Sequence, residues 1–175
     1  MQTILTPRFW LALALVAAGV VLRVMPHPWN FAPIGAIALF GGAHFERRWV
    51  GVVLPLATMF IGDWFIGLHS LMPVIYATYA LIAVIGMLLR ERRRSVAFVG
   101  GASLLSSTIF YLTTNFAVWE MGTTYAHTAS GLLQCYVAAI PFFGNTIASD
   151  LLFTGIFFSL YGGLVANRFT ATQRH

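Results

Sequence analysis

The chain has 175 residues, of which 59% are hydrophobic and only 9% are charged. Soluble domains carry about 25% charged residues, so this composition excludes a soluble domain and indicates an integral membrane protein. The chain has ten arginines, no lysine and five acidic residues, which gives a formal net charge of +5. In a membrane protein such charges set the topology, so we expect the lipid bilayer as a partner and no nucleic acid.

Six apolar segments are predicted to be transmembrane helices, because a helix needs roughly 20 apolar residues to cross a bilayer. In chain order they cover about 8–25, 31–44, 49–67, 72–89, 96–118 and a last long stretch, 132–166. That last stretch is too long for one crossing and contains Pro141. We therefore expect 132–143 to lie at the interface and 145–166 to cross. The total length predicts a single transmembrane domain, residues 1–175.

The arginines predict the orientation. Six crossings place both termini on one side, and nine of the ten arginines then fall on that side. These nine are Arg8, Arg47, Arg48, Arg90, Arg92, Arg93, Arg94, Arg168 and Arg174. Because arginine and lysine are enriched in cytoplasmic loops, we expect both termini in the cytoplasm and Arg23 outside. The run RERRR (90–94) is interpreted first as a topology anchor and second as a docking site for a cytoplasmic partner or anionic lipid.

Polar and aromatic side chains gather on the predicted outward side, which makes that side the candidate ligand-binding site. They come from the three outward connections and the helix ends beside them. The candidate ligand-binding residues are His27, Asn30, Asp63, His69, Tyr76, Asn115, Trp119, Tyr136, Asn145 and Asp150. Aromatic belts at membrane interfaces are the alternative explanation for the tryptophan and the tyrosines.

Asp63 and Asp150 fall within or beside apolar runs, where an ionisable group costs at least a few kcal/mol and marks a site or an ion pair. Each acid is predicted either to line a site or to support the scaffold. In the second case Asp63 pairs with Arg23 or caps a helix.

The stretch PHPWNFAPIG (26–35) is predicted to be the turn between the first two spans. Pro26 and Pro28 end one helix, and Pro33 lies in the first turn of the next, where a missing N–H is tolerated. We expect this turn to hold His27 and Asn30 toward the same outward space as Asp63 and Asp150.

No nucleophile, nucleotide-binding or metal motif occurs in the chain, so no catalytic residue and no intrinsic cofactor are predicted. Cys135 is the single cysteine and has no activating base beside it, which predicts a buried, unreactive thiol.

Four motifs carry a resemblance that covers nearly the whole chain. They are PHPWNFAPIGAIALFGGA (26–43), DWFIGLH (63–69), TNFAVW (114–119) and CYVAAIPFFGNTIASD (135–150). They resemble a family of small bacterial membrane proteins, mostly of unknown function, with a pattern like L-P-H-P-x-N-F-T-P. In size and six-helix layout the chain is similar to the S components of energy-coupling factor (ECF) vitamin transporters. Within that group it resembles the solitary cobalamin-transporting proteins of Gram-negative bacteria.

The resemblance implies a multi-pass protein of the bacterial inner membrane that binds a vitamin outside and moves it inward. Cobalamin or a related corrinoid is the expected ligand, with Cys135 or His27 as the ligand to its cobalt. The small residues Ala14 and Ala18 would contact a T component, whose partner ATPases supply energy. Two alternatives stay open: a membrane enzyme acting on a lipid or cofactor through its Asp and His residues, and an accessory subunit of a membrane complex.

Overall fold

The computed structural model describes the backbone of residues 7–172 and the side chains of residues 9–162. This part of the chain is all-α, with six α-helices and one short 3-10 helix, Arg90–Arg92. The α-helices are α1 (Pro7–Val24), α2 (Ile34–His44), α3 (Arg48–Ile66), α4 (Met72–Leu88), α5 (Val96–Met121) and α6 (Ala129–Thr172). The predicted all-α class is confirmed, and the first five helices start and end within three residues of the predicted segments.

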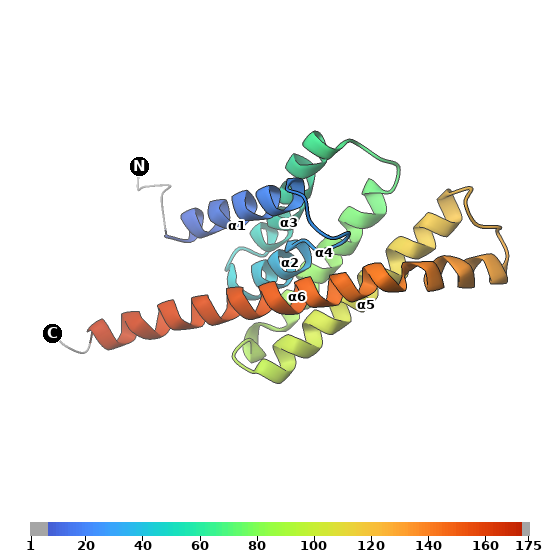
Figure 1. The fold of residues 1–175 in the computed structure, drawn as a ribbon. Helices are drawn as coiled ribbons and strands as arrows, with labels where there is room; N and C mark the ends of the chain where they lie inside the picture. Colours follow the sequence, from blue (N-terminus) through green and yellow to red (C-terminus); the bar gives the residue numbers. More distant parts are fainter. Residues whose placement is uncertain (1–6, 173–175) are drawn as a thin grey trace.

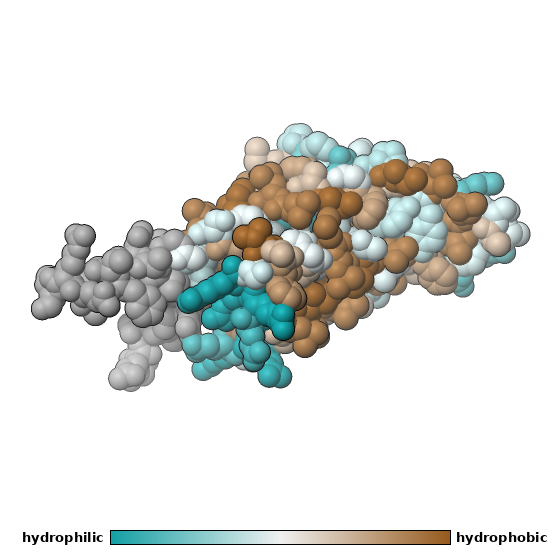
Figure 2. Space-filling model, turned by 90° about the horizontal axis from the view of Figure 1, so that it is seen from below, coloured by the Kyte–Doolittle hydropathy of each residue, from teal (hydrophilic) through white to brown (hydrophobic). Residues whose placement is uncertain are grey.

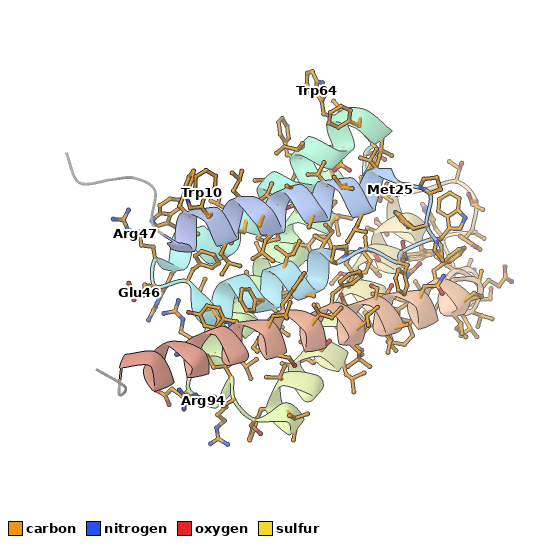
Figure 3. The ribbon with its side chains drawn as sticks, turned by 60° about the vertical axis from the view of Figure 1, so that its left-hand side comes forward. Trp10, Met25, Glu46, Arg47, Trp64 and Arg94 are labelled. Carbon is orange, nitrogen blue, oxygen red and sulfur yellow. The ribbon has the colours of Figure 1, made fainter. Side chains whose placement is uncertain are left out.

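Successive helices alternate in direction, so alternate connections lie at opposite ends of the bundle (Figure 1). The two ends differ in chemistry. Helix α1 begins and α6 ends on the left in Figure 1, the side of the α2–α3 and α4–α5 connections. These connections carry Arg47 and Arg94, and we call this side the arginine-rich end (Figure 3). The opposite end carries segments 25–33, 67–71 and 122–128. Arg174 lies outside the described residues, and the side chains of Arg8 and Arg168 lie outside the described side chains.

The surface between the two ends is apolar, as in a protein that lies in a bilayer. Three helices in the described chain are long and apolar enough to cross a membrane: Arg48–Ile66, Val96–Met121 and Ala129–Gly162. The apolar helices Phe9–Val24, Ile34–His44 and Met72–Leu88 are shorter. Trp64 is 72% exposed and, like Trp10, points away from the bundle (Figure 3). In Figure 2 a hydrophilic patch borders a broad hydrophobic surface.

Helix α6 differs from the prediction. Residues 129–172 form one continuous helix with Pro141 inside it, so the predicted break between an interfacial piece and a crossing piece is wrong. Its 44 residues give a length of about 66 Å, roughly twice the hydrocarbon thickness of a bilayer. Proline removes one backbone hydrogen bond but does not stop a helix when neighbouring helices hold both sides of it. Here α5 lies along α6.

The shortest α-helix, α2, forms the centre of the bundle. All residues from Ile34 to Ala43 are buried, and α2 contacts each of the other five α-helices. At 11 residues it is only about 16 Å long, about half the hydrocarbon thickness. The preceding segment, 25–33, is non-helical and connects α1 to α2.

Glycines let the neighbouring backbones approach α2 closely. A Cβ atom at Gly42 would overlap the carbonyl of Ala83 in α4, and one at Gly86 would overlap the carbonyl of Leu39. Gly41 faces Gly51 of α3 in the same way. In membranes, where water does not drive helices together, such close contact supplies the packing energy.

Replacing Gly42 by alanine is expected to lower the free energy of unfolding by about 1–3 kcal/mol, because the methyl group must displace the backbone of α4. Gly144→Ala is the matched control, since a Cβ at Gly144 meets no atom within 4 Å. Thermal unfolding in detergent, followed by circular dichroism, measures both variants. Equal stability of the two would contradict the close contact.

Candidate functional site

Arg23, Asp63 and Tyr76 form a buried cluster that joins α1, α3 and α4. The Arg23 Nη2 atom lies 2.5 Å from Oδ1 of Asp63, and the Tyr76 hydroxyl donates to Oδ2 at 2.7 Å. The Asp63 side chain is fully buried, with 0% exposure. Both carboxylate oxygens are therefore engaged within the protein. Of the two interpretations of Asp63, the geometry favours the ion pair that holds helices together.

Asp150 of α6 forms a second buried cluster, with α5 and α2. Its Oδ2 accepts a hydrogen bond from the Ser107 hydroxyl at 2.7 Å, and the side chain is 4% exposed. The carboxylate lies against the first turn of α2, where a Cβ at Gly35 would overlap it. A helix N-terminus carries a partial positive charge, which stabilises a carboxylate placed there. The Asp150 side chain thus packs against the start of the central helix.

The segment 25–33 lies along α6, which supplies partners for its backbone. Asn145 donates to the carbonyl of Trp29 at 2.9 Å, and Ser149 donates to the carbonyl of Ala32 at 3.2 Å. Non-helical backbone at membrane depth is tolerated where protein groups satisfy it in this way. Asn30 has a φ of 61°, a left-handed conformation that asparagine adopts more readily than most residues.

Four more of the predicted residues lie in the α5–α6 hairpin and mostly bond to its backbone. The Asn115 amide donates to the carbonyl of Tyr111 at 2.8 Å, and the Trp119 ring N–H donates to the carbonyl of Ala126 at 2.9 Å. The Tyr136 hydroxyl donates to the carbonyl of Leu112 at 2.8 Å. Cys135 is 2% exposed, and its thiol donates to the carbonyl of Asn115 at 3.4 Å. These bonds fix the hairpin at the opposite end of the bundle.

The predicted ligand-binding residues therefore lie in separate groups. Asp63 and Tyr76 are in one cluster, and Asp150 is in another. His27 and Asn30 belong to the first connection, which Asn145 of α6 contacts, and His69 lies exposed in the second. These groups have different hydrogen-bond partners, and a ligand site at these ten positions stays a prediction.

Neither predicted cobalt ligand is free. The His27 ring nitrogens lie 2.7 Å from the carbonyl oxygen of Pro28 and 3.0 Å from that of Arg23. Cys135 is enclosed between α5 and α6. Within the described part of the chain, no three His, Cys, Asp or Glu side chains are grouped closely enough to hold a metal ion. A corrinoid would thus have to be held without a cobalt–protein bond, or after these contacts are broken.

A shallow, open cavity of about 520 Å³, with an almost wholly apolar surface, lies at the opposite end, between α4, α5 and the start of α6. Val74, Leu112, Phe116 and Met121 form apolar walls. Its polar lining residues are Thr113, Glu120 and Tyr136. Small-molecule sites have this chemistry, mostly apolar with a few placed polar groups, and volumes of roughly 300–1,000 Å³. Tyr136 is the one predicted ligand-binding residue that lines it.

Two residues that shape the acid clusters were not among the predicted site residues: Gly35 and Ser107. Ser107 is detectable from the sequence as part of a helical repeat, since Ser103 and Ser107 lie four residues apart on one face. Gly35 has no such signal, because its role depends on how close α6 lies to α2.

The amino-acid sequence matches one known protein family. A family model described as a family of unknown function, DUF6580, matches residues 3–172. The chain belongs to the DUF6580 family. The predicted resemblance to a family of unknown function is confirmed. Comparison with curated proteins finds no match, and neither does comparison with solved structures.

Removing one partner of the Arg23–Asp63 pair is expected to destabilise the bundle by about 3–5 kcal/mol, because the other charge stays buried and unpaired. Arg23→Met and Asp63→Asn are the single variants. The loss in free energy of unfolding should be much smaller in the double variant than the sum of the losses in the two single variants. A double-mutant cycle of thermal unfolding measures this difference. Additive losses would show that the two side chains do not interact.

Gly35→Ala is expected to lower the free energy of unfolding by about 1–3 kcal/mol, because the new methyl group overlaps the Asp150 carboxylate. The same substitution made in an Asp150→Ala background should cost clearly less, since the overlapping atoms are gone. Unfolding of the four proteins in detergent tests this. A Gly35→Ala penalty that is unchanged in both backgrounds would place Asp150 away from α2.

Proposed function

We propose that this protein is a membrane uptake protein of the S-component type. It binds a vitamin-sized organic ligand at the end opposite the arginines and moves it toward the cytoplasm. The observation that carries the proposal is the cavity at that end, with its apolar walls and its three polar groups, Thr113, Glu120 and Tyr136. Cobalamin or a related corrinoid is the first ligand to test, on the strength of the sequence motifs.

The proposed orientation places six helices across the bacterial inner membrane with both termini in the cytoplasm. The apolar surface between the ends and the arginines at one end support it, because positive charge is retained on the cytoplasmic side. Helices α1, α2 and α4 are shorter than a full crossing. In this orientation the connections and the bundle cover the remaining depth.

A T component with its ATPases is the proposed partner, and the outer face of α1 is the proposed contact. Ala14 and Ala18 are both exposed, whereas Leu15 and Gly19 of the same helix pack inward. Small residues one turn apart let a second helix approach closely. The chain supplies no nucleotide-binding motif, so a partner would provide the energy for transport.

The positions of Asp63 and Asp150 give less support to an enzyme than the cavity gives to an uptake protein. Asp63 and Asp150 are enclosed by their partners, and neither lines the cavity. An acid–base catalyst must reach its substrate within hydrogen-bond distance.

Isothermal titration of the full chain in detergent against cobalamin and a panel of other vitamins tests the proposal. One member should bind with a dissociation constant in the micromolar range or below. Glu120→Gln should change that affinity several-fold, because Glu120 lines the cavity, whereas Glu91→Gln at the arginine-rich end should not. If no vitamin binds at micromolar concentration, the protein is not a vitamin-uptake component.

A further inference from the structure

A second and larger cavity, of about 750 Å³, lies at the arginine-rich end between α5 and α6. Two of its lining residues, Arg93 and Arg94, carry positive charge, and no carboxylate among the described residues lines it. Its walls are apolar, with Val96, Val99, Leu151 and Phe158 among them. The cavity therefore has a cationic mouth and a hydrophobic interior.

The floor of this cavity is open because glycines line it. Gly100 of α5 and Gly155 of α6 both line it, and a Cβ added at either would meet no atom within 4 Å. The cavity also opens sideways, since Val96 at its edge is 88% exposed. Side chains of ordinary size at these glycines would fill the space. The glycines thus leave a slot along the two helices.

One buried hydroxyl in the cavity has no partner. Thr154 is 2% exposed, and its Oγ1 has no hydrogen-bond partner among the described residues. The hydroxyls of Ser106 and Thr146, by contrast, donate to the carbonyl four residues before them. Among the described buried hydroxyls, that of Ser103 also lacks a partner. A buried unpaired hydroxyl costs free energy, so a bound polar group beside Thr154 would stabilise the protein.

Arg94 is a free cation at the mouth. The neighbouring arginines have partners within the protein. Arg90 donates hydrogen bonds to the carbonyls of Gly42 and Phe45, and one Nη atom of Arg93 donates to the carbonyl of Ala43 at 3.2 Å. The Arg92 guanidinium lies over the ring of Phe98. For Arg94 the described part of the chain provides no such partner, and its side chain extends away from the bundle (Figure 3). Its guanidinium is available to an anion.

We propose that this cavity binds one anionic phospholipid, with the phosphate at Arg93 and Arg94 and an acyl chain in the slot between α5 and α6. The lining residues of α6 run from Leu151 to Gly162, which corresponds to about 16 Å of helix, the depth of one bilayer leaflet. The hydrophilic patch beside the apolar surface in Figure 2 matches a headgroup at the interface and a chain along the helices. Basic pockets between transmembrane helices recognise anionic headgroups in this way.

Native mass spectrometry of the full chain in detergent tests the proposal, with phosphatidylglycerol and phosphatidylcholine of identical chains as probes. Phosphatidylglycerol should bind as a single molecule and at least five-fold more tightly than phosphatidylcholine. Arg94→Gln should remove most of that preference, whereas Arg47→Gln, an exposed arginine that does not line the cavity, should keep it. Equal binding of the two lipids, or equal effects of the two arginine variants, would overturn the proposal.

Gly155→Leu is the steric test, because its side chain would occupy the slot. It should reduce binding of phosphatidylglycerol at least five-fold. Gly144→Leu on the same helix faces open space outside the cavity and should bind as the parent protein does. Unchanged binding by Gly155→Leu would overturn the assigned site. Thermal unfolding of all variants confirms that they are folded.

Inorganic phosphate and glycerol phosphate distinguish a lipid from a soluble phosphate ester. Neither compound at millimolar concentration should displace phosphatidylglycerol, since neither fills the apolar slot. Displacement by either would overturn the lipid assignment in favour of a soluble ligand. This outcome is independent of whether a vitamin binds at the opposite end.

Discussion

The close approach of α2 to the backbones around it is the constraint on which the rest of the structure depends. Gly41, Gly42, Gly51 and Gly86 allow carbonyl groups of α2 and its neighbours to lie where side chains would otherwise be. Such contact gives strong packing between helices that have no hydrophobic force to bring them together in lipid. The short helix α2 is surrounded by the other five α-helices.

The shortness of α2 explains the polar residues of the bundle. The chain between α1 and α2, residues 25–33, is non-helical, and its carbonyls need partners, which Asn145 and Ser149 supply from α6. The next residue of α6, Asp150, places its carboxyl group against Gly35 in the first turn of α2. Residues that resemble a ligand site in the sequence thus contact the turn before α2 and the first residues of this helix. Their cost in an apolar environment is offset by these bonds.

The two cavities lie at opposite ends of the α5–α6 pair and differ in chemistry. The cavity beside Glu120 and Tyr136 is apolar with few polar groups, whereas the cavity beside Arg93 and Arg94 has a cationic mouth. Between them the facing sides of α5 and α6 carry Ser103, Ser107 and Asp150. Lipid at the arginine-rich end, as proposed, would contact the same pair of helices that borders the cavity beside Glu120.

The sequence by itself determined the helices, their order and the charge asymmetry between the two ends, because these follow from local hydrophobicity and arginine position. It also identified Asp63 and Asp150 as exceptional, and Arg23 as a candidate partner of Asp63. Only the tertiary structure decided that α6 runs unbroken through Pro141, and that Asp150 meets Gly35 and Ser107. These features depend on how closely two helices distant in sequence approach one another. The cavities depend on the same distances. Thr154 carries no signal in the linear pattern, and Arg94 is marked only as part of the run RERRR (90–94), for which anionic lipid is one interpretation.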